Sequence, residues 1–310
     1  MPCSVPVTTS AERRSRLGAA MVASAALLWG GWSLVLRPSG LAAPQSSLVV
    51  LLVLALPAPF VVRRARLRDR GAALALVVLG LADVGNMVLY FAAIHRGPVA
   101  VAVLTHYLAP VLVALAAPWL GDPRSPRALW AAPFSLLGLG LLVWRPGGEA
   151  PGVTAALGAG SAVFYAAVVF AARRAGRSWP PVAVTSLHAV ISAATLLLLL
   201  GGEALPPPGP GTLRVAAGAL VCGIVASLLF YGGLSRVAAP VAGALTYLEP
   251  LSAAVVGALA FGERLGWSAL VGAAVVVAGG VWVALEPPVP RGSEAAGEPR
   301  NPPAASAPRR

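Results

Sequence analysis

The chain has 310 residues, of which 58% are hydrophobic and 11% charged, and its formal net charge is +12. Soluble domains carry roughly 25% charged residues, so this composition and the mean hydropathy of +0.81 exclude an ordinary soluble protein and indicate a membrane protein. The basic residues are all arginines that punctuate apolar runs, so nucleic-acid binding is not expected. The two cysteines, Cys3 and Cys222, exclude a disulfide framework and a zinc-ligand spacing.

A helix needs about 20 mainly apolar residues to cross a bilayer. The sequence offers ten such segments, separated by short breaks rich in Arg, Pro and Gly. The first follows three arginines and could mimic a signal peptide, but it is full length and we interpret it as an uncleaved span. We therefore expect an all-α integral membrane protein with ten transmembrane helices, at 17–36, 45–62, 72–94, 98–120, 128–144, 152–172, 180–200, 212–234, 238–261 and 267–285.

The arginines predict the orientation, because cytoplasmic loops retain positive charge. If the N-terminus is inside, 18 of the 23 arginines fall in inside segments and the other five are spread one to each outside loop. Residues 1–16 then form a cytoplasmic arm, and 286–310, rich in Pro, Gly, Ala and charge, form a disordered cytoplasmic tail. Both termini are expected in the cytoplasm. This asymmetry across the lipid bilayer also accounts for the high net charge without an anionic partner.

An internal repeat divides the chain into 17–144 and 152–285. A shift of 140 residues lays "YFAAIHRGPVAVAVLTHYLAP" (90–110) over "FYGGLSRVAAPVAGALTYLEP" (230–250), which aligns Tyr107 with Tyr247 and Pro110 with Pro250. Five spans per repeat is an odd number, so the two repeats enter the membrane from opposite sides. Inverted repeats are typical of alternating-access transporters, whose substrate site lies near the midplane between the repeats.

Four ionisable residues lie inside the expected spans: Asp83, His106, His188 and Glu249. Each is within about 5 Å of the centre of its span at the helical rise. Charged groups at that depth are costly and usually face a cavity or a partner, which favours one shared polar site. The alternative for Glu249 and Asp83 is a neutral carboxyl bonded to a neighbouring helix, and for each histidine a bond to a backbone carbonyl.

Four further residues are candidates for the same substrate and proton pathway. Asn86 follows Asp83 by three residues and shares its helical face. Tyr107 and Tyr247 are the paired tyrosines of the repeat. Trp29 lies in the first span, away from the usual interfacial belt, where it could wall a cavity or simply pack.

The two aligned prolines predict helix breaks at mid-depth. Proline lacks an N–H and its ring crowds the carbonyl four residues back, which is that of His106 for Pro110 and that of Thr246 for Pro250. Exposed carbonyls at this depth are tolerated only where they line protein or water. We expect Pro110 and Pro250 to act as hinges, although prolines are also common in spanning helices.

Motifs for other energy sources and for enzymatic chemistry are missing from the sequence. No P-loop occurs, so ATP is not expected to drive the protein. No metal-ligand grouping or catalytic triad is recognisable, and we expect no metal and no cofactor. A membrane-embedded enzyme that uses Asp83, His106 or His188 as acid or base would place these groups near one interface, whereas here they lie at mid-depth.

The residues resemble a known family at three places. These are "LLWGGW" in the first span, "YLEPLSAAVVGALAFGERL" closing the ninth, and the Gly-rich tenth span. Together they look like the EamA family of the drug/metabolite transporter superfamily, over roughly 17–285. The sequence departs from the family pattern at Asp122, where a glutamate is usual, and Ala109 stands where the second repeat has Glu249.

The resemblance implies a ten-span carrier of the bacterial inner membrane with its cavity between the repeats. We expect a secondary transporter, not an enzyme, that exports a small-molecule substrate such as an amino acid by proton-coupled or facilitative alternating access. A drug efflux carrier is the rival within transport, and a membrane enzyme acting on a lipid-linked substrate is the rival outside it. The sequence leaves a monomer and a homodimer open.

Overall fold

The computed structural model describes residues 10–62, 69–96, 103, 105–143, 152–261 and 266–285, and in these residues every regular element is a helix. The helices of the first half are α1 (Ser10–Gly30), α2 (Trp32–Leu36), α3 (Ala43–Ala55), α4 (Ala58–Val62), α5 (Arg70–Arg96), α7 (Ala109–Ala116) and α8 (Pro126–Val143). Short 3₁₀ turns η1 (Arg37–Ser39) and η2 (Ala117–Leu120) follow α2 and α7. The all-helical expectation is confirmed.

The second half has helices of similar lengths. They are α9 (Gly152–Ala175), α10 (Pro181–Leu200), α11 (Pro210–Gly218), α12 (Ala226–Leu234), α13 (Ala239–Leu245), α14 (Leu248–Phe261) and α15 (Trp267–Ala284). The 3₁₀ turn η3 (Gly201–Ala204) follows α10, and the π-helical segment η4 (Ala219–Val225) joins α11 to α12.

Seven helical stretches of the described chain are long and apolar enough to cross a membrane, so the protein is a multi-pass membrane protein. Each overlaps one of the ten expected spans. Part of the expected span at 98–120 lies outside the described residues, and within the described part α7 begins at Ala109 after a turn. Two shorter apolar helices, Ala109–Leu120 and Leu270–Val283, cover parts of expected spans four and ten.

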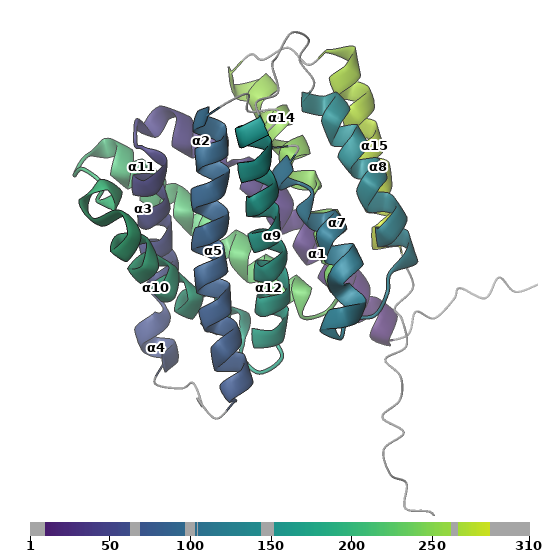
Figure 1. The fold of residues 1–310 in the computed structure, drawn as a ribbon, viewed down its shortest axis with the longest axis horizontal. Coiled ribbons are helices and arrows are strands. Elements are labelled where there is room, and N and C mark those ends of the chain that lie inside the picture. The colour runs from purple at the N-terminus through teal and green to yellow at the C-terminus, as the bar shows by residue number, and fades with distance from the viewer. Residues whose placement is uncertain are drawn as a thin grey trace, which may run out of the picture.

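The helices pack in pairs that bring distant parts of the chain together. In Figure 1, α5 and α9 run side by side through the centre, α3 and α10 lie together at the left, and α8 and α15 lie together at the right. The core between α1, α5, α9, α10 and α12 is built mainly from alanine, valine and leucine. Small residues let the backbones approach: a Cβ on Gly80 of α5 would stand 2.6 Å from Ile191 of α10.

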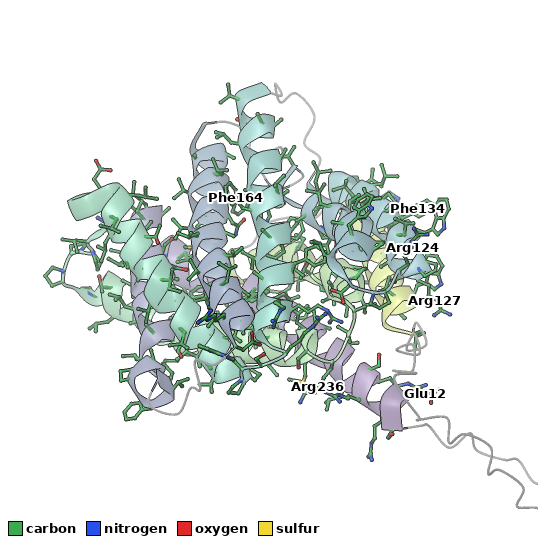
Figure 2. The ribbon with its side chains drawn as sticks, turned by 60° about the horizontal axis from the view of Figure 1, so that its bottom comes forward. Glu12, Arg124, Arg127, Phe134, Phe164 and Arg236 are labelled. Carbon is green, nitrogen blue, oxygen red and sulfur yellow. The ribbon has the colours of Figure 1, made fainter. Side chains whose placement is uncertain are left out.

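One end of the bundle holds the start of α1 and the ends of α9, α12 and α15. A Cβ added to Gly18 of α1 would meet the Arg236 side chain just after α12. Arg127, at the start of α8, donates from Nη1 to the carbonyl of Trp282 near the end of α15, at 3.3 Å. We call this the arginine-rich end; Figure 2 labels Glu12, Arg124, Arg127 and Arg236 among its side chains. The helices that carry the two termini therefore meet at the same end.

Candidate functional site

The helical chain is interrupted just before Pro110 and just before Pro250, where the sequence predicts a break. Tyr107 and Leu108 form a turn before α7, and Thr246 and Tyr247 form a turn between α13 and α14. The carbonyl of Thr246 accepts from the N–H of Glu249 at 3.0 Å, since Pro250 has no N–H to offer it. Each break therefore interrupts the helical hydrogen bonds directly before α7 or α14 begins.

The two breaks are bonded to each other. The hydroxyl of Tyr247 donates to the backbone carbonyl of Tyr107 at 2.9 Å, and the two rings lie with centroids 5.8 Å apart. A carbonyl freed by a helix break and buried in the protein costs free energy unless it finds a donor. Tyr247, fully buried, supplies that donor to its own counterpart in the other half.

Glu249 lies in the first turn of α14, directly behind the second break. Its carboxyl group has the Tyr107 hydroxyl as hydrogen-bond partner. Tyr90 and Tyr165 also lie close enough to interact with it electrostatically. Within the described part of the chain no arginine pairs with this carboxyl group, so phenolic hydroxyls form its polar surroundings.

His106 sits in the middle of the tyrosines. Its Nδ1 lies 2.9 Å from Oγ of Ser161, and that hydroxyl donates its single proton to the carbonyl of Gly158 at 2.7 Å. Oγ of Ser161 therefore acts as acceptor, which assigns the proton of a neutral His106 to Nδ1 and leaves Nε2 with a free lone pair. The imidazole ring is 4.3 Å from the Tyr90 ring and 5.5 Å from the Tyr165 ring, centroid to centroid.

Asp83 of α5 has its polar partners on α10. It accepts a hydrogen bond from the Ser192 hydroxyl at 3.3 Å, and its Oδ2 lies 3.8 Å from Nε2 of His188. Nδ1 of His188 bonds the carbonyl of Val184 at 2.8 Å, and a carbonyl only accepts, so Nε2 is again the basic nitrogen of the neutral ring. The close approach of α5 and α10 at Gly80 brings these side chains within reach of each other.

Tyr165 and Tyr231 connect the surroundings of Glu249 with those of Asp83. Tyr165 interacts electrostatically with both Glu249 and Asp83, and Tyr231 interacts with Asp83 and Tyr165. The Tyr231 ring stands edge-on to His188, with centroids 5.6 Å apart. All five tyrosines of the protein thus belong to one set, which we call the tyrosine cluster: Tyr90, Tyr107, Tyr165, Tyr231 and Tyr247.

The structure thus gathers most of the residues singled out from the sequence, but not all. The side-chain oxygen of Asn86 is buried without a hydrogen-bond partner among the described residues. Trp29 packs against Phe230 with ring centroids 5.0 Å apart, so its ring contact is with the apolar core. Sequence reasoning left Tyr90 and Tyr231 out of the site. Both lie in the last turns of their expected spans, 72–94 and 212–234, where a tyrosine of the interfacial belt is also usual, so the sequence carried no signal that pointed to the site.

The cluster contains groups that bind protons and hydrogen-bond donors. Two carboxyl groups and two basic Nε2 atoms can take up or release a proton, and hydroxyls stand beside them. Among the described residues no group of three or more His, Cys, Asp or Glu side chains could hold a metal ion. Its chemistry is therefore that of proton exchange and polar recognition inside an apolar bundle.

The model of the EamA-like transporter family matches this chain twice, over residues 16–144 and 152–285. The chain belongs to the EamA-like transporter family. We refer to the two matched segments as the first and second halves. An uncharacterized transporter of Archaeoglobus fulgidus is 31% identical over 226 residues, which are 71% of this chain and 78% of that protein. The uncharacterized transporter YwfM of Bacillus subtilis is 29% identical over 217 residues, 67% of this chain and 72% of that protein.

Solved structures agree with this EamA-like fold. One crystal structure is 23% identical, with a TM-score of 0.73, over 86% of this chain and 98% of that chain. At that identity the likeness speaks for the fold alone. The family and the relatives point to a membrane transporter of small molecules and not to an enzyme.

Proposed function

We propose that this protein is a secondary transporter with ten spans in two inverted five-helix repeats, which exports a small metabolite such as an amino acid. Transport proceeds by alternating access, either coupled to protons or facilitative, with the substrate and Glu249 in the tyrosine cluster. Asp83, Asn86, His106, Tyr107, His188 and Tyr247 line the same pathway with Trp29 behind them, and Pro110 and Pro250 are its hinges.

The helix pairs support the inverted repeat. α3 and α8 of the first half pack on α10 and α15, which hold the same places in the second half. α1 packs on α12 and α14, and α9, the counterpart of α1, packs on α5 and α7. An exchange of the two halves therefore maps these contacts onto one another, as a two-fold relation between repeats requires.

The observation that carries the proposal is the setting of Glu249. A carboxyl group at mid-span is costly unless it serves a pathway or finds a partner. Here its polar neighbours are tyrosines, which share hydrogen bonds with a carboxyl group in either protonation state. A group held this way is free to exchange its proton, whereas an arginine partner would hold it ionised.

Two other groups support a substrate site beside Glu249. The unpartnered oxygen of Asn86 is available to a donor on a bound molecule. The Asp83–His188 pair offers a second place for a proton. One specific observation favours the rival drug efflux carrier, since tyrosine rings next to a carboxylate also suit a lipophilic cation.

The proposed setting is the bacterial cell membrane, with both termini in the cytoplasm. The concentration of arginine in the loops that join the arginine-rich end supports this orientation. The start of α1 and the end of α15 both lie at this end, which fits the orientation as well. The assembly is a monomer or a homodimer.

An export experiment in a bacterial host tests the proposal. Internal and external metabolite pools are compared by mass spectrometry for cells that carry an empty vector, the wild type, Glu249→Gln and Glu203→Gln. Glu203 is an exposed glutamate in η3, away from the tyrosine cluster, and serves as matched control. We expect the wild type and the control to raise the external level of at least one metabolite and Glu249→Gln to lose that effect.

Two outcomes contradict the proposal in different ways. If the wild type reaches the membrane and changes no external pool, export is wrong. If Glu249→Gln exports as fast as the wild type, the role of Glu249 is wrong while transport stands. Raised resistance to lipophilic cations without any metabolite change would favour the efflux carrier.

A further inference from the structure

Two consecutive arginines close to the end of α9 each make an ion pair with the other half of the chain. Nε of Arg173 lies 2.5 Å from Oδ1 of Asp122. Nη2 of Arg174 lies 3.2 Å from Oδ1 of Asp69, and Nη1 lies 3.3 Å from Oδ2. Asp69 precedes α5 and Asp122 follows η2, so both carboxylates belong to the first half and both arginines to the second.

The Arg173 pair is almost entirely buried. The side chains of Arg173 and Asp122 are 11% and 3% exposed. Arg173 also donates from Nη1 to the carbonyl of Leu234 at 2.7 Å and to the carbonyl of Val237. It therefore ties together the end of η2, the end of α9 and the connection from α12 to α13.

The Arg174 pair is more exposed and is built on a helix cap. Side-chain exposure is 41% for Arg174 and 36% for Asp69. Oδ1 of Asp69 accepts from the N–H of Ala72 at 3.0 Å, which caps the start of α5. The Ser178 hydroxyl donates to Oδ2. Asp69 thus joins the start of α5 to the end of α9.

Both pairs lie at the arginine-rich end, because Arg173 also bonds the carbonyls of Leu234 and Val237, on either side of Arg236. The bond from Arg127 to Trp282 at that end also crosses between the halves. The two breaks of the tyrosine cluster cross the halves as well, but through neutral groups. The two ion pairs between an arginine and an aspartate that join the halves of the described chain thus lie at this one end. Elsewhere Arg214 reaches across the halves only to the backbone carbonyl of Pro38, at 3.0 Å. In a carrier with this orientation, the arginine-rich end is the cytoplasmic one.

We propose that Arg173 and Arg174 form the cytoplasmic gate of this transporter. They hold Asp122 and Asp69 while the cytoplasmic end is shut, and they release both when the halves part toward the inward-open state. This inference rests on the proposed function, because a gate between halves requires alternating access. It assigns a role to four residues that lie far from the tyrosine cluster.

The different burial of the two pairs sets the order of opening. An exposed ion pair is easily broken, because water solvates both charges as they separate. A buried pair cannot lose one partner without leaving a charge unsolvated, so it opens only when water enters between the halves. Arg174 therefore releases Asp69 first, and the separation of Arg173 from Asp122 accompanies full opening.

A distance measurement tests the gate without any substrate. Spin labels are placed at Arg124→Cys and Arg177→Cys, exposed positions of the first and second halves at this end, in a chain that also carries Cys3→Ser and Cys222→Ala. Their separation is compared by pulsed electron resonance with and without the changes Asp122→Asn, Arg173→Gln and Arg174→Gln. Removal of both members of the buried pair avoids an unpaired buried charge.

We expect the neutralised variant to gain a population at longer distance, and Arg173→Lys, which keeps the charge, to retain most of the short one. An unchanged distance distribution in a folded neutral variant would overturn the gate. Loss of the short distance in the charge-keeping variant alone would also overturn it, since the effect would then come from packing.

A second test of the gate uses reversible cross-linking. Asp69→Cys and Arg174→Cys are joined by a short, reducible, thiol-specific reagent, and uptake of a labelled amino-acid mixture into proteoliposomes is measured before and after reduction. The control joins Gly176→Cys to Ser235→Cys, both in the second half, where a Cβ on residue 176 would lie 4.0 Å from Cβ of Ser235.

The gate predicts that transport is lost in the first cross-linked protein, returns on reduction and persists in the control. Transport that continues with Asp69→Cys and Arg174→Cys joined would overturn it. If even the wild type moves none of the labels, the proposed function fails instead, and the distance measurement still decides whether the ion pairs hold this end together.

Discussion

The tyrosine cluster and the arginine-rich end both contain carboxyl groups, but they surround them differently. At the arginine-rich end, Asp69 and Asp122 each face an arginine from the opposite half. In the tyrosine cluster, Glu249 faces phenolic hydroxyls, and Asp83 faces a serine and a histidine. Carboxylates paired with arginine hold structure together, whereas those beside hydroxyl and imidazole groups are free to exchange protons.

The largest effect we expect is on stability, at the arginine-rich end. Arg173→Gln leaves Asp122 buried and unpaired, which typically destabilises a protein by about 3–5 kcal/mol. Glu249→Gln should leave the melting temperature nearly unchanged, because it removes no partner charge. Thermal unfolding of both variants in detergent tests this contrast. A Glu249→Gln protein that melts as early as Arg173→Gln would show that Glu249 is also a structural charge.

A smaller loss of stability is expected where the two breaks meet. Tyr247→Phe removes the hydroxyl that bonds the carbonyl of Tyr107, and an unsatisfied buried carbonyl costs about 1–3 kcal/mol. Tyr231→Phe is the matched control, because no hydrogen bond of its hydroxyl is found within the described chain. Equal melting temperatures for the two variants would mean that the hydrogen bond between the breaks contributes nothing to stability.

The smallest effect concerns pH at the arginine-rich end. The Ser178 hydroxyl, the Ala72 N–H and Arg174 hold the pKa of Asp69 well below its usual range. Such a group stabilises the fold above its unfolded pKa of about 3.9, and this contribution is lost as pH falls through the lower folded pKa.

Asp69→Asn should therefore lower the melting temperature by the same amount anywhere between about pH 5 and pH 8, and the difference should shrink only below about pH 4. Melting curves of the variant and the wild type across this range provide the check. A difference that disappears between about pH 5 and pH 7 would mean that Asp69 titrates near neutrality. Any pH dependence of transport in that range would then not be assignable to Glu249 alone.

The sequence predicted the helical class, the family and the two helix breaks, because these depend on local properties. Apolar length predicts a span, and the two aligned prolines, Pro110 and Pro250, predicted the two breaks, whereas Pro133 lies inside α8 without one. The prediction that Asp83 and His188 share a site also follows from depth alone, since both lie at mid-span, and the structure brings them together.

The contacts between helices could not be predicted in the same way. Asp122 stood out only as a departure from the family pattern, and its partner, Arg173, lies 51 residues further along the chain. Tyr247 and Tyr107 were aligned as equivalent residues, but equivalence did not reveal that one bonds the other. Trp29 was left as either a cavity wall or a packing residue, and its ring packs on Phe230. The position of a side chain along its span can be predicted from the sequence, whereas the direction in which it points depends on how the helices pack.

The proton role of Glu249 can be measured with a pH gradient. Proteoliposomes that contain the wild type, Glu249→Gln or Glu203→Gln are given a labelled amino-acid mixture, with and without a difference in pH across the membrane. Proton coupling through Glu249 predicts that the wild type and Glu203→Gln accumulate label against its gradient only when the pH difference is present, and that Glu249→Gln merely equilibrates it. Accumulation by Glu249→Gln equal to that of the wild type would contradict this role.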